Sequence, residues 1–91
     1  MDFQTEGNSI VYKSADGVVL ARADFSEAAP GVYDIFHTEV DASLQGQGIA
    51  GNLVARVVAE IERRGGKTIK EASCSYAAAW LKRHAEKGVS Q

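Results

Sequence analysis

The chain has 91 residues, of which 45% are hydrophobic and 24% charged, so it has the composition of a soluble globular domain and is too short for two ordinary ones. Its 10 basic residues against 12 acidic ones leave a net charge of -2, which argues against binding to nucleic acid. The single cysteine excludes an intramolecular disulfide, and zinc-ligand spacings are absent. Because the sequence shows no signal peptide and no apolar run of about 18 residues, it predicts a cytoplasmic protein with no membrane span.

The first half of the chain predicts antiparallel strands. Residues 9–13 are rich in β-branched and aromatic side chains, Asp16-Gly17 tolerates positive φ, and residues 18–25 alternate apolar with polar side chains, so we expect a β-hairpin. Period-2 alternation places four residues of the second strand on one buried face: Val19, Ala21, Ala23 and Phe25.

A third strand is predicted at residues 32–40, after a turn at Pro30-Gly31. Because it is bulky on both faces, it is expected to be central in the sheet and covered on both sides. Strict alternation places Tyr33, Ile35, His37 and Glu39 on one face and Phe36, Thr38 and Val40 on the other. Glu39 and His37 are therefore candidates for the base that deprotonates an amine. The alternative is that these two polar residues only satisfy one another beside the sheet.

The clearest helix is predicted at residues 46–64. Its buried stripe has a four-residue period and contains Ile49, Leu53, Val57 and Ile61. The residues expected on the opposite, solvent-exposed face are Asn52, Arg56, Glu60 and Arg63. Gly65-Gly66 is expected to end this helix, because glycine adopts the left-handed conformation without steric cost.

The last quarter predicts a short strand and a second helix. Residues 67–73 contain one large apolar residue, and Ser73 or Ser75 can cap a helix over residues 76–87 that ends at Gly88. The resulting order is β-β-β-α-β-α. We therefore expect an α/β (α+β) fold with a mainly antiparallel sheet and one parallel βαβ step.

Between the third strand and the long helix lies a glycine-rich turn, Gln45-Gly46-Gln47-Gly48-Ile49-Ala50. A helix begins with unpaired N–H groups and the positive end of its dipole, so this place can bind an anion without a lysine. Two glycines in a helix's first turn would each cost about 1 kcal/mol relative to alanine. Either they open the turn to a phosphate, or they only allow a tight connection between strand and helix.

Two motifs in this chain carry a resemblance to a known family. Gln45-x-x-Gly48-x-Ala50 resembles the R/Q-x-x-G-x-G/A signature of the GCN5-related N-acetyltransferase (GNAT) superfamily. Downstream, a C-x-Y-x-x-x-W-x-x-x-H segment typical of its short-chain branch is matched by Cys74, Tyr76, Trp80 and His84. The resemblance covers roughly residues 9–88, and it implies one GNAT-like domain over residues 1–91.

The resemblance also implies a ligand, coenzyme A or acetyl-coenzyme A. Its pyrophosphate would lie on the turn formed by Gln45, Gly46, Gln47, Gly48, Ile49 and Ala50. Its pantetheine arm would lie against the backbone at Val40, in a gap between two parallel strands that splay. Tyr76 and Trp80 are either core aromatics or walls of the channel for the thioester.

Two further residues are candidates for the chemistry. Cys74 stands just before a predicted helix start, where the dipole favours a thiolate; it is either a nucleophile or a small buried hydrophobe. His84 stands where related enzymes have a tyrosine that protonates the departing coenzyme A thiolate, or it is a surface residue stabilised near a helix C-terminus.

The implied activity is transfer of acetyl from acetyl-coenzyme A to an amine of a small molecule or a protein. The rival hypothesis is a non-catalytic acyl-coenzyme A-binding or partner-interaction module. It rests on length, because 91 residues leave no room for the extra helices and C-terminal strands that form the acceptor site in ordinary GNAT domains.

Overall fold

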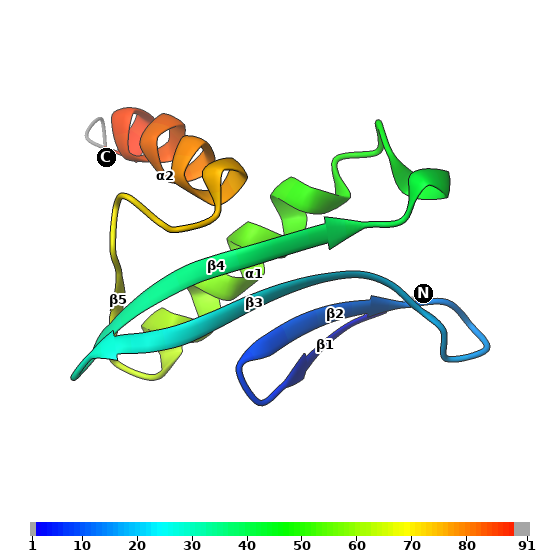
Figure 1. Cartoon of the computed structure of the whole chain (residues 1–91), viewed down its shortest axis with the longest axis horizontal. Coiled ribbons are helices and arrows are strands. Elements are labelled where there is room, and N and C mark those ends of the chain that lie inside the picture. Colours follow the sequence, from blue (N-terminus) through cyan, green and yellow to red (C-terminus); the bar gives the residue numbers. More distant parts are fainter. Residues whose placement is uncertain (1, 89–91) are drawn as a thin grey trace.

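A computed structural model describes residues 2–88 and shows a five-stranded sheet with two helices (Figure 1). The elements follow in the order β1 (Asp2–Glu6), β2 (Ser9–Lys13), β3 (Val19–Ala29), β4 (Val32–Val40), the short 3-10 helix η1 (Ala42–Leu44), α1 (Ile49–Arg63), β5 (Lys67–Thr68) and α2 (Ser75–Gly88). Strands β1 to β4 pair antiparallel in sequence order, and β5 pairs parallel to β4. The predicted fold class, mainly antiparallel with one parallel βαβ step, is confirmed. In the part of the chain that the structure describes, neither helix has the length and apolarity to cross a membrane.

The sheet has one strand more than the predicted order. Strand β1 pairs with β2 along its whole length, although its five residues contain no apolar run that would predict a strand. Phe3 supplies its main packing contact: the ring lies 4.6 Å, centroid to centroid, from Tyr12 on β2, and the Arg56 guanidinium lies 4.3 Å from its centre. Tertiary contacts therefore create this strand, and its own sequence pattern does not.

Helix α1 crosses one face of the sheet, as Figure 1 shows behind β3 and β4. Its predicted stripe is buried: Leu53, Val57 and Ile61 are fully covered and Ile49 is 8% exposed. The helix ends as predicted, because the Gly66 N–H donates to the Ile61 carbonyl at 3.0 Å and Gly65, with φ of 84°, follows the last helical residues.

Glu60 lies on the buried side of α1, and not on the solvent-exposed side as predicted. It is 9% exposed because two arginines accompany it: Arg63 Nη2 and Arg64 Nε lie 2.6 and 2.7 Å from its carboxylate. Arg64 also donates to Asn8 Oδ1 and to the Gly7 carbonyl, both at 2.7 Å. The carboxylate thus orients an arginine that ties the β1–β2 turn to the end of α1.

Strand β4 contains a β-bulge at Phe36, which overturns the predicted faces. Asp24 of β3 lies opposite His37 and Phe25 lies opposite Ile35, so Phe36 has no partner on β3. An extra residue reverses the alternation that follows it. The later residues therefore divide as follows: Thr38 and Val40 share the α1 face with Ile35, and His37 and Glu39 share the other face.

The expectation that β4 is covered on both sides is also wrong. Phe36 is 49% exposed, and His37 and Glu39 are exposed. A similar irregularity in the hairpin sets Lys13 opposite Val19 and Tyr12 opposite Ala21, and it leaves Val19 43% exposed although we expected it to be buried.

Strand β5 ends five residues earlier than predicted. It pairs only with the first two residues of β4, and after Ile69 N–H donates to the Tyr33 carbonyl the chain bends away. Residues 70–73 are mostly polar or small and give the strand no apolar face. The neighbouring edge of β4 is consequently left without a strand partner from the bulge onward, in the described part of the chain.

The ion pairs of Glu60 predict a pH-dependent contribution to stability. Hydrogen bonds from Arg63, then from Arg64, lower the pKa of Glu60 to about 2. Because the pKa of Glu60 is lower in the folded protein than in the unfolded chain, its ionised carboxylate stabilises the fold fully at pH values above its ordinary pKa near 4.5. This contribution disappears as the pH falls towards about 2. Glu60→Gln should therefore reduce the free energy of unfolding at pH 7, and its deficit should shrink as pH falls from about 4.5 towards 2. Urea unfolding at pH 7 and pH 3 measures this, with Glu62→Gln, an exposed position on the same helix, as control. An equal deficit at both pH values would contradict the prediction.

Candidate functional site

A groove of about 360 Å³ opens where the end of β4 meets the start of α1, and we call it the β4 groove. Its walls come from four parts of the chain: β4, the connection after it, the first turn of α1, and α2. The lining residues are Thr38, Glu39, Val40, Leu44, Gln45, Gly46, Gly48, Ile49, Ala50 and Tyr76. The structure thus brings together most residues of the predicted ligand site. Gln47 does not line the groove; it is exposed, and its Nε2 donates to the Ser43 carbonyl at 3.5 Å.

The glycine turn, residues 45–48, is held in place from its N-terminal side. The Ser43 N–H and hydroxyl both donate to Asp41 Oδ2, at 3.0 and 2.5 Å, and these hydrogen bonds lower the pKa of Asp41. Gly46 and Gly48 have φ of 86° and 74°, and Gly48 is the N-cap of α1. Both glycines precede the helix and do not lie in its first turn. Their positive φ is therefore a sufficient reason for glycine at each position.

The start of α1 faces open space. The first intrahelical bond runs from Asn52 N–H to the Gly48 carbonyl at 3.1 Å, so the three preceding N–H groups have no partner within the helix. A Cβ atom placed on Gly46 or Gly48 would meet no atom within 4 Å. No acidic side chain stands in the first turn. This arrangement of free donors and the positive end of a helix dipole suits an anionic group.

Cys74 is the N-cap residue of α2, where Ser73 or Ser75 was predicted. The Ala78 N–H donates to the Cys74 carbonyl at 2.9 Å, which begins the helix. Partial burial opposes ionisation of the thiol, but hydrogen bonds from the Thr38 hydroxyl and from the N–H groups of Ala77, Tyr76 and Thr38 outweigh it and lower the pKa of Cys74. The sulfur thus occupies the place that a serine or aspartate oxygen takes in most N-caps.

The position of Cys74 is set by β4. The Ser73 N–H and hydroxyl donate to the two carboxylate oxygens of Asp34, at 2.8 and 2.6 Å, and the Cys74 N–H donates to the Ile35 carbonyl at 3.0 Å. These bonds leave Cys74 Sγ 3.4 Å from Thr38 Oγ1. Sequence reasoning missed Asp34 and Thr38, because the pattern of β4 carries no mark of the bulge that turns Thr38 towards the sulfur.

His37 and Glu39 lie next to each other on the face of β4 away from α1. His37 Nε2 is 3.4 Å from Glu39 Oε1, and the two side chains are 48% and 68% exposed. Glu39 also reaches the rim of the β4 groove. The geometry is compatible with both expectations, a polar pair and a base at the edge of the site.

Tyr76, Trp80 and His84 follow one another at four-residue spacing and share one side of α2. The Trp80 and His84 rings are stacked with centroids 3.6 Å apart, and His84 Nδ1 is 2.9 Å from the Trp80 carbonyl. A Cβ on Gly51 would lie 3.4 Å from Tyr76 Oη and 3.6 Å from Trp80 Nε1, so glycine lets α1 approach α2 closely. Ten residues at 1.5 Å rise place His84 about 15 Å along the helix from Cys74. Only Tyr76 of these three lines the β4 groove.

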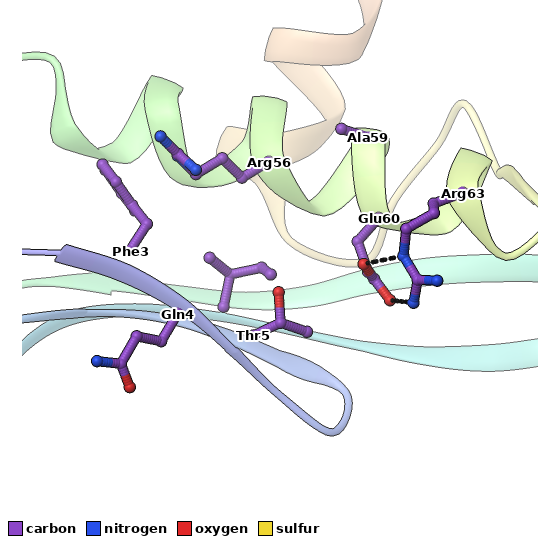
Figure 2. A pocket seen from close by; sticks show the side chains of 8 residues that line it. Phe3, Gln4, Thr5, Arg56, Ala59, Glu60 and Arg63 are labelled. Atoms are coloured by element: carbon purple, nitrogen blue, oxygen red, sulfur yellow. Dashed lines mark hydrogen bonds and ion pairs between the residues drawn. The ribbon is translucent and has the colours of Figure 1, made fainter.

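A second cavity, of about 220 Å³, lies between β1 and α1 and is drawn in Figure 2. Figure 2 shows the Glu60–Arg63 ion pair and the Arg56 side chain at its wall on α1. It shares no lining residue with the β4 groove and contains none of the predicted site residues. The β4 groove is therefore the candidate site.

Comparisons with known proteins identify the family to which this fold is similar. A family model described as GCN5-related N-acetyl-transferase matches residues 10–89. The chain is similar to a “GCN5-like putative N-acetyltransferase” from Staphylococcus aureus, with 26% identity and a TM-score of 0.72, over 93% of this chain and 81% of that one. It is also similar to a GNAT-family protein from Desulfovibrio desulfuricans, with 25% identity and a TM-score of 0.57, over 64% of this chain and 38% of that one. No curated protein matches the chain.

The donors around Cys74 predict a thiol that ionises more readily in the folded protein. Because folding lowers its pKa, more thiolate is present at a given pH, and alkylation by iodoacetamide should reach half its maximal rate at lower pH than in urea-unfolded protein. The unfolded chain is a matched reference because Cys74 is the only cysteine. Mass spectrometry gives the rate at each pH. A midpoint that is equal or higher in the folded protein would contradict the assignment of these donors.

Proposed function

The chain belongs to the GCN5-related N-acetyltransferase (GNAT) family, and on that premise we propose that it transfers the acetyl group of acetyl-coenzyme A to an amine of a small molecule or a protein. The observation that carries the proposal is the β4 groove. It joins an open helix N-terminus with an unpaired strand edge, and Thr38 in its wall lies 3.4 Å from the sulfur of Cys74.

The helix N-terminus suits the pyrophosphate. The free N–H groups at Ile49 and Ala50 point out of α1, and the glycines at 46 and 48 place no side chain in front of them. Phosphate oxygens are strong acceptors, and the helix dipole favours their charge. Gln45 lines the groove and can add a side-chain donor. Gln47 would support the turn only indirectly, since its N–H donates to the Leu44 carbonyl at 3.3 Å.

The open edge of β4 suits the pantetheine arm. The Asp41 N–H donates to the Leu20 carbonyl of β3 at 2.7 Å. Backbone groups alternate in direction along a strand, so those of Val40 and Thr38 point to the opposite edge, where β5 has already ended. In the described part of the chain, the Thr38 carbonyl and both backbone groups of Val40 have no strand partner on that side. An extended chain with two amides can pair there like an added strand.

Cys74 is proposed to act as a nucleophile. Its thiolate attacks the carbonyl carbon of the thioester; a new bond forms from Sγ, the bond to the coenzyme sulfur breaks, and the electron pair leaves as coenzyme A thiolate. The acceptor amine then attacks acetyl-Cys74 and regenerates the thiolate. The competing route is direct attack by the amine, with Cys74 only lining the channel.

Protons would be handled at the rim of the groove. The acceptor amine must lose a proton, which would pass directly or through water to Glu39 at the groove or to His37, whose Nε2 is 3.4 Å from Glu39 Oε1. His84 would serve as the donor to the departing thiolate only if that sulfur lies further along α2 than Cys74. Tyr76 would wall the channel, and Trp80 would support it through the close contact with Gly51.

A non-catalytic module is the second candidate, and one observation favours it. The sheet face opposite α1 carries the exposed Phe36 beside His37 and Glu39, which is a surface available to a partner. On this alternative the chain would bind the acyl-coenzyme without transferring its acetyl group. The two functions differ in whether Cys74 acquires acetyl.

Coenzyme A binding should depend on Gly48. A Cβ there projects into the open space before the helix, so Gly48→Ala should weaken binding at least tenfold, about 1.4 kcal/mol, in calorimetry. Alanine at positive φ also costs roughly 1 to 2 kcal/mol of stability. Gly17→Ala is the matched control, because Gly17 has φ of 87° in the β2–β3 turn, which does not line the β4 groove, and a Cβ there also meets no atom within 4 Å. It should lose similar stability and keep full affinity. Equal affinity in both variants would remove the turn from the binding site.

The nucleophile is tested with Cys74→Ser. After incubation with acetyl-coenzyme A, mass spectrometry should find acetyl on Cys74 of the parent protein and none on the variant. Transfer to a panel of amines should fall at least tenfold, about 1.4 kcal/mol in the barrier, because a hydroxyl is a much weaker nucleophile. The variant should still bind coenzyme A. If it transfers acetyl as fast as the parent, the direct route is correct.

A further inference from the structure

Thr38 contacts the sulfur of Cys74 from the side of β4. Its hydroxyl oxygen lies 3.4 Å from Sγ, and its backbone N–H is directed at the same atom. The α2 N-terminus supplies the donors on the other side, the N–H groups of Tyr76 and Ala77. We propose that Thr38 is a positioning residue, whose hydroxyl in the wall of the β4 groove holds the Cys74 sulfur behind it in place. This proposal rests on the function proposed above for that groove.

The bulge at Phe36 is what makes this contact. With regular alternation from Ile35, the side chain of His37 would lie on the α1 side of β4 and Thr38 on the other. The extra residue instead aligns Thr38 with Ala23, a core residue that is fully buried under α1. Thr38 therefore lines the groove together with Tyr76, and its bond to the sulfur lies at the groove wall.

The chemistry of the contact changes with the charge of the sulfur. A neutral thiol and a hydroxyl can each donate to the other, so either direction is possible before ionisation. A thiolate can only accept, and then the Thr38 O–H must donate to it in a charge-assisted hydrogen bond. When the sulfur attacks a thioester carbonyl, its charge passes to the leaving thiolate and the bond weakens. The hydroxyl thus favours the reactive state over the acetylated one.

The neighbouring ionisable groups do not duplicate this role. On β4, both carboxylate oxygens of Asp34 accept bonds from Ser73, the residue before Cys74. On α2, the side chain of Tyr76 lies at the groove wall, and the first turn of α1 carries no acidic residue. Glu39 and its partner His37 lie on the opposite face of β4 from Thr38, with Glu39 at the groove rim.

The test compares the parent with three variants by the pH dependence of Cys74 alkylation with iodoacetamide. Thr38→Val keeps the shape of the side chain and removes the hydroxyl, so its midpoint should move upward. Loss of one hydrogen bond predicts that alkylation below the midpoint slows roughly two- to tenfold, whereas the rates above the midpoint converge. Thr38→Ser keeps the hydroxyl and should behave like the parent. If Thr38→Val does not fold, Thr38→Ala takes its place with the same expectation.

Thr5→Val makes the same change at an exposed position on β1 and should leave the alkylation profile unaltered. Unchanged midpoints in both Thr38→Val and Thr5→Val would overturn the proposal, as would an equal slowing at every pH, which would indicate only a packing defect. The outcome is separable from the proposed function. If Thr38→Val shifts the midpoint but the parent never acquires acetyl from acetyl-coenzyme A, the positioning role stands and the acetyl-Cys74 route falls. If the parent is acetylated, and Thr38→Val is acetylated equally fast with an unshifted midpoint, the acetyl-Cys74 route stands and the positioning role of Thr38 falls.

Discussion

The unpaired residue in the middle of β4 determines how the rest of the site is built. Phe36 has no partner on β3, so the strand gains one residue and the side chains after it exchange faces. Thr38 and Val40 turn towards α1 and the groove, and the polar pair of His37 and Glu39 turns to the open face. A bulge also bends its strand and increases the local twist. Since β5 ends at Thr68, the edge of β4 stays open where the groove begins.

Two sets of hydrogen bonds and ion pairs hold the helices against this sheet, and they have different roles. At the C-terminus of α1, Glu60 and Arg64 fasten the helix to the β1–β2 turn, far from the groove. At the N-terminus of α2, Asp34 and the Ile35 carbonyl fasten the segment that contains Cys74 to β4. The first set stabilises the fold. The second set fixes the sulfur of Cys74 relative to β4. A substitution in β4 can therefore displace this candidate nucleophile even if the substituted residue does not contact Cys74.

The sequence predicts the parts of this protein that depend on local pattern. The stripe of Leu53 and Val57, the stop at Gly65 and the anion-suited turn before Ile49 each follow from period, steric freedom or dipole, and the fold class follows from their order. The bulge at Phe36 could not be predicted, because register is set by pairing with β3 and one extra residue leaves no mark in composition. The cap at Cys74 was missed for a related reason: two serines flank it, and only the bonds to β4 decide which of the three residues begins α2.

The open edge of β4 needs an explanation of its own, because an unpaired strand edge attracts other chains and natural proteins usually cover or charge it. Here the edge is covered up to Ile35 by β5 and by the N–H of Cys74, and Tyr76 of α2 stands over the continuation. A second polypeptide strand would bring side chains on both faces into this space. An extended ligand with amides but without side chains would not. Tyr76 of α2 lines the same groove, so a protein strand paired at Val40 would also have to accommodate that aromatic side chain, whereas a narrower extended chain would need less space.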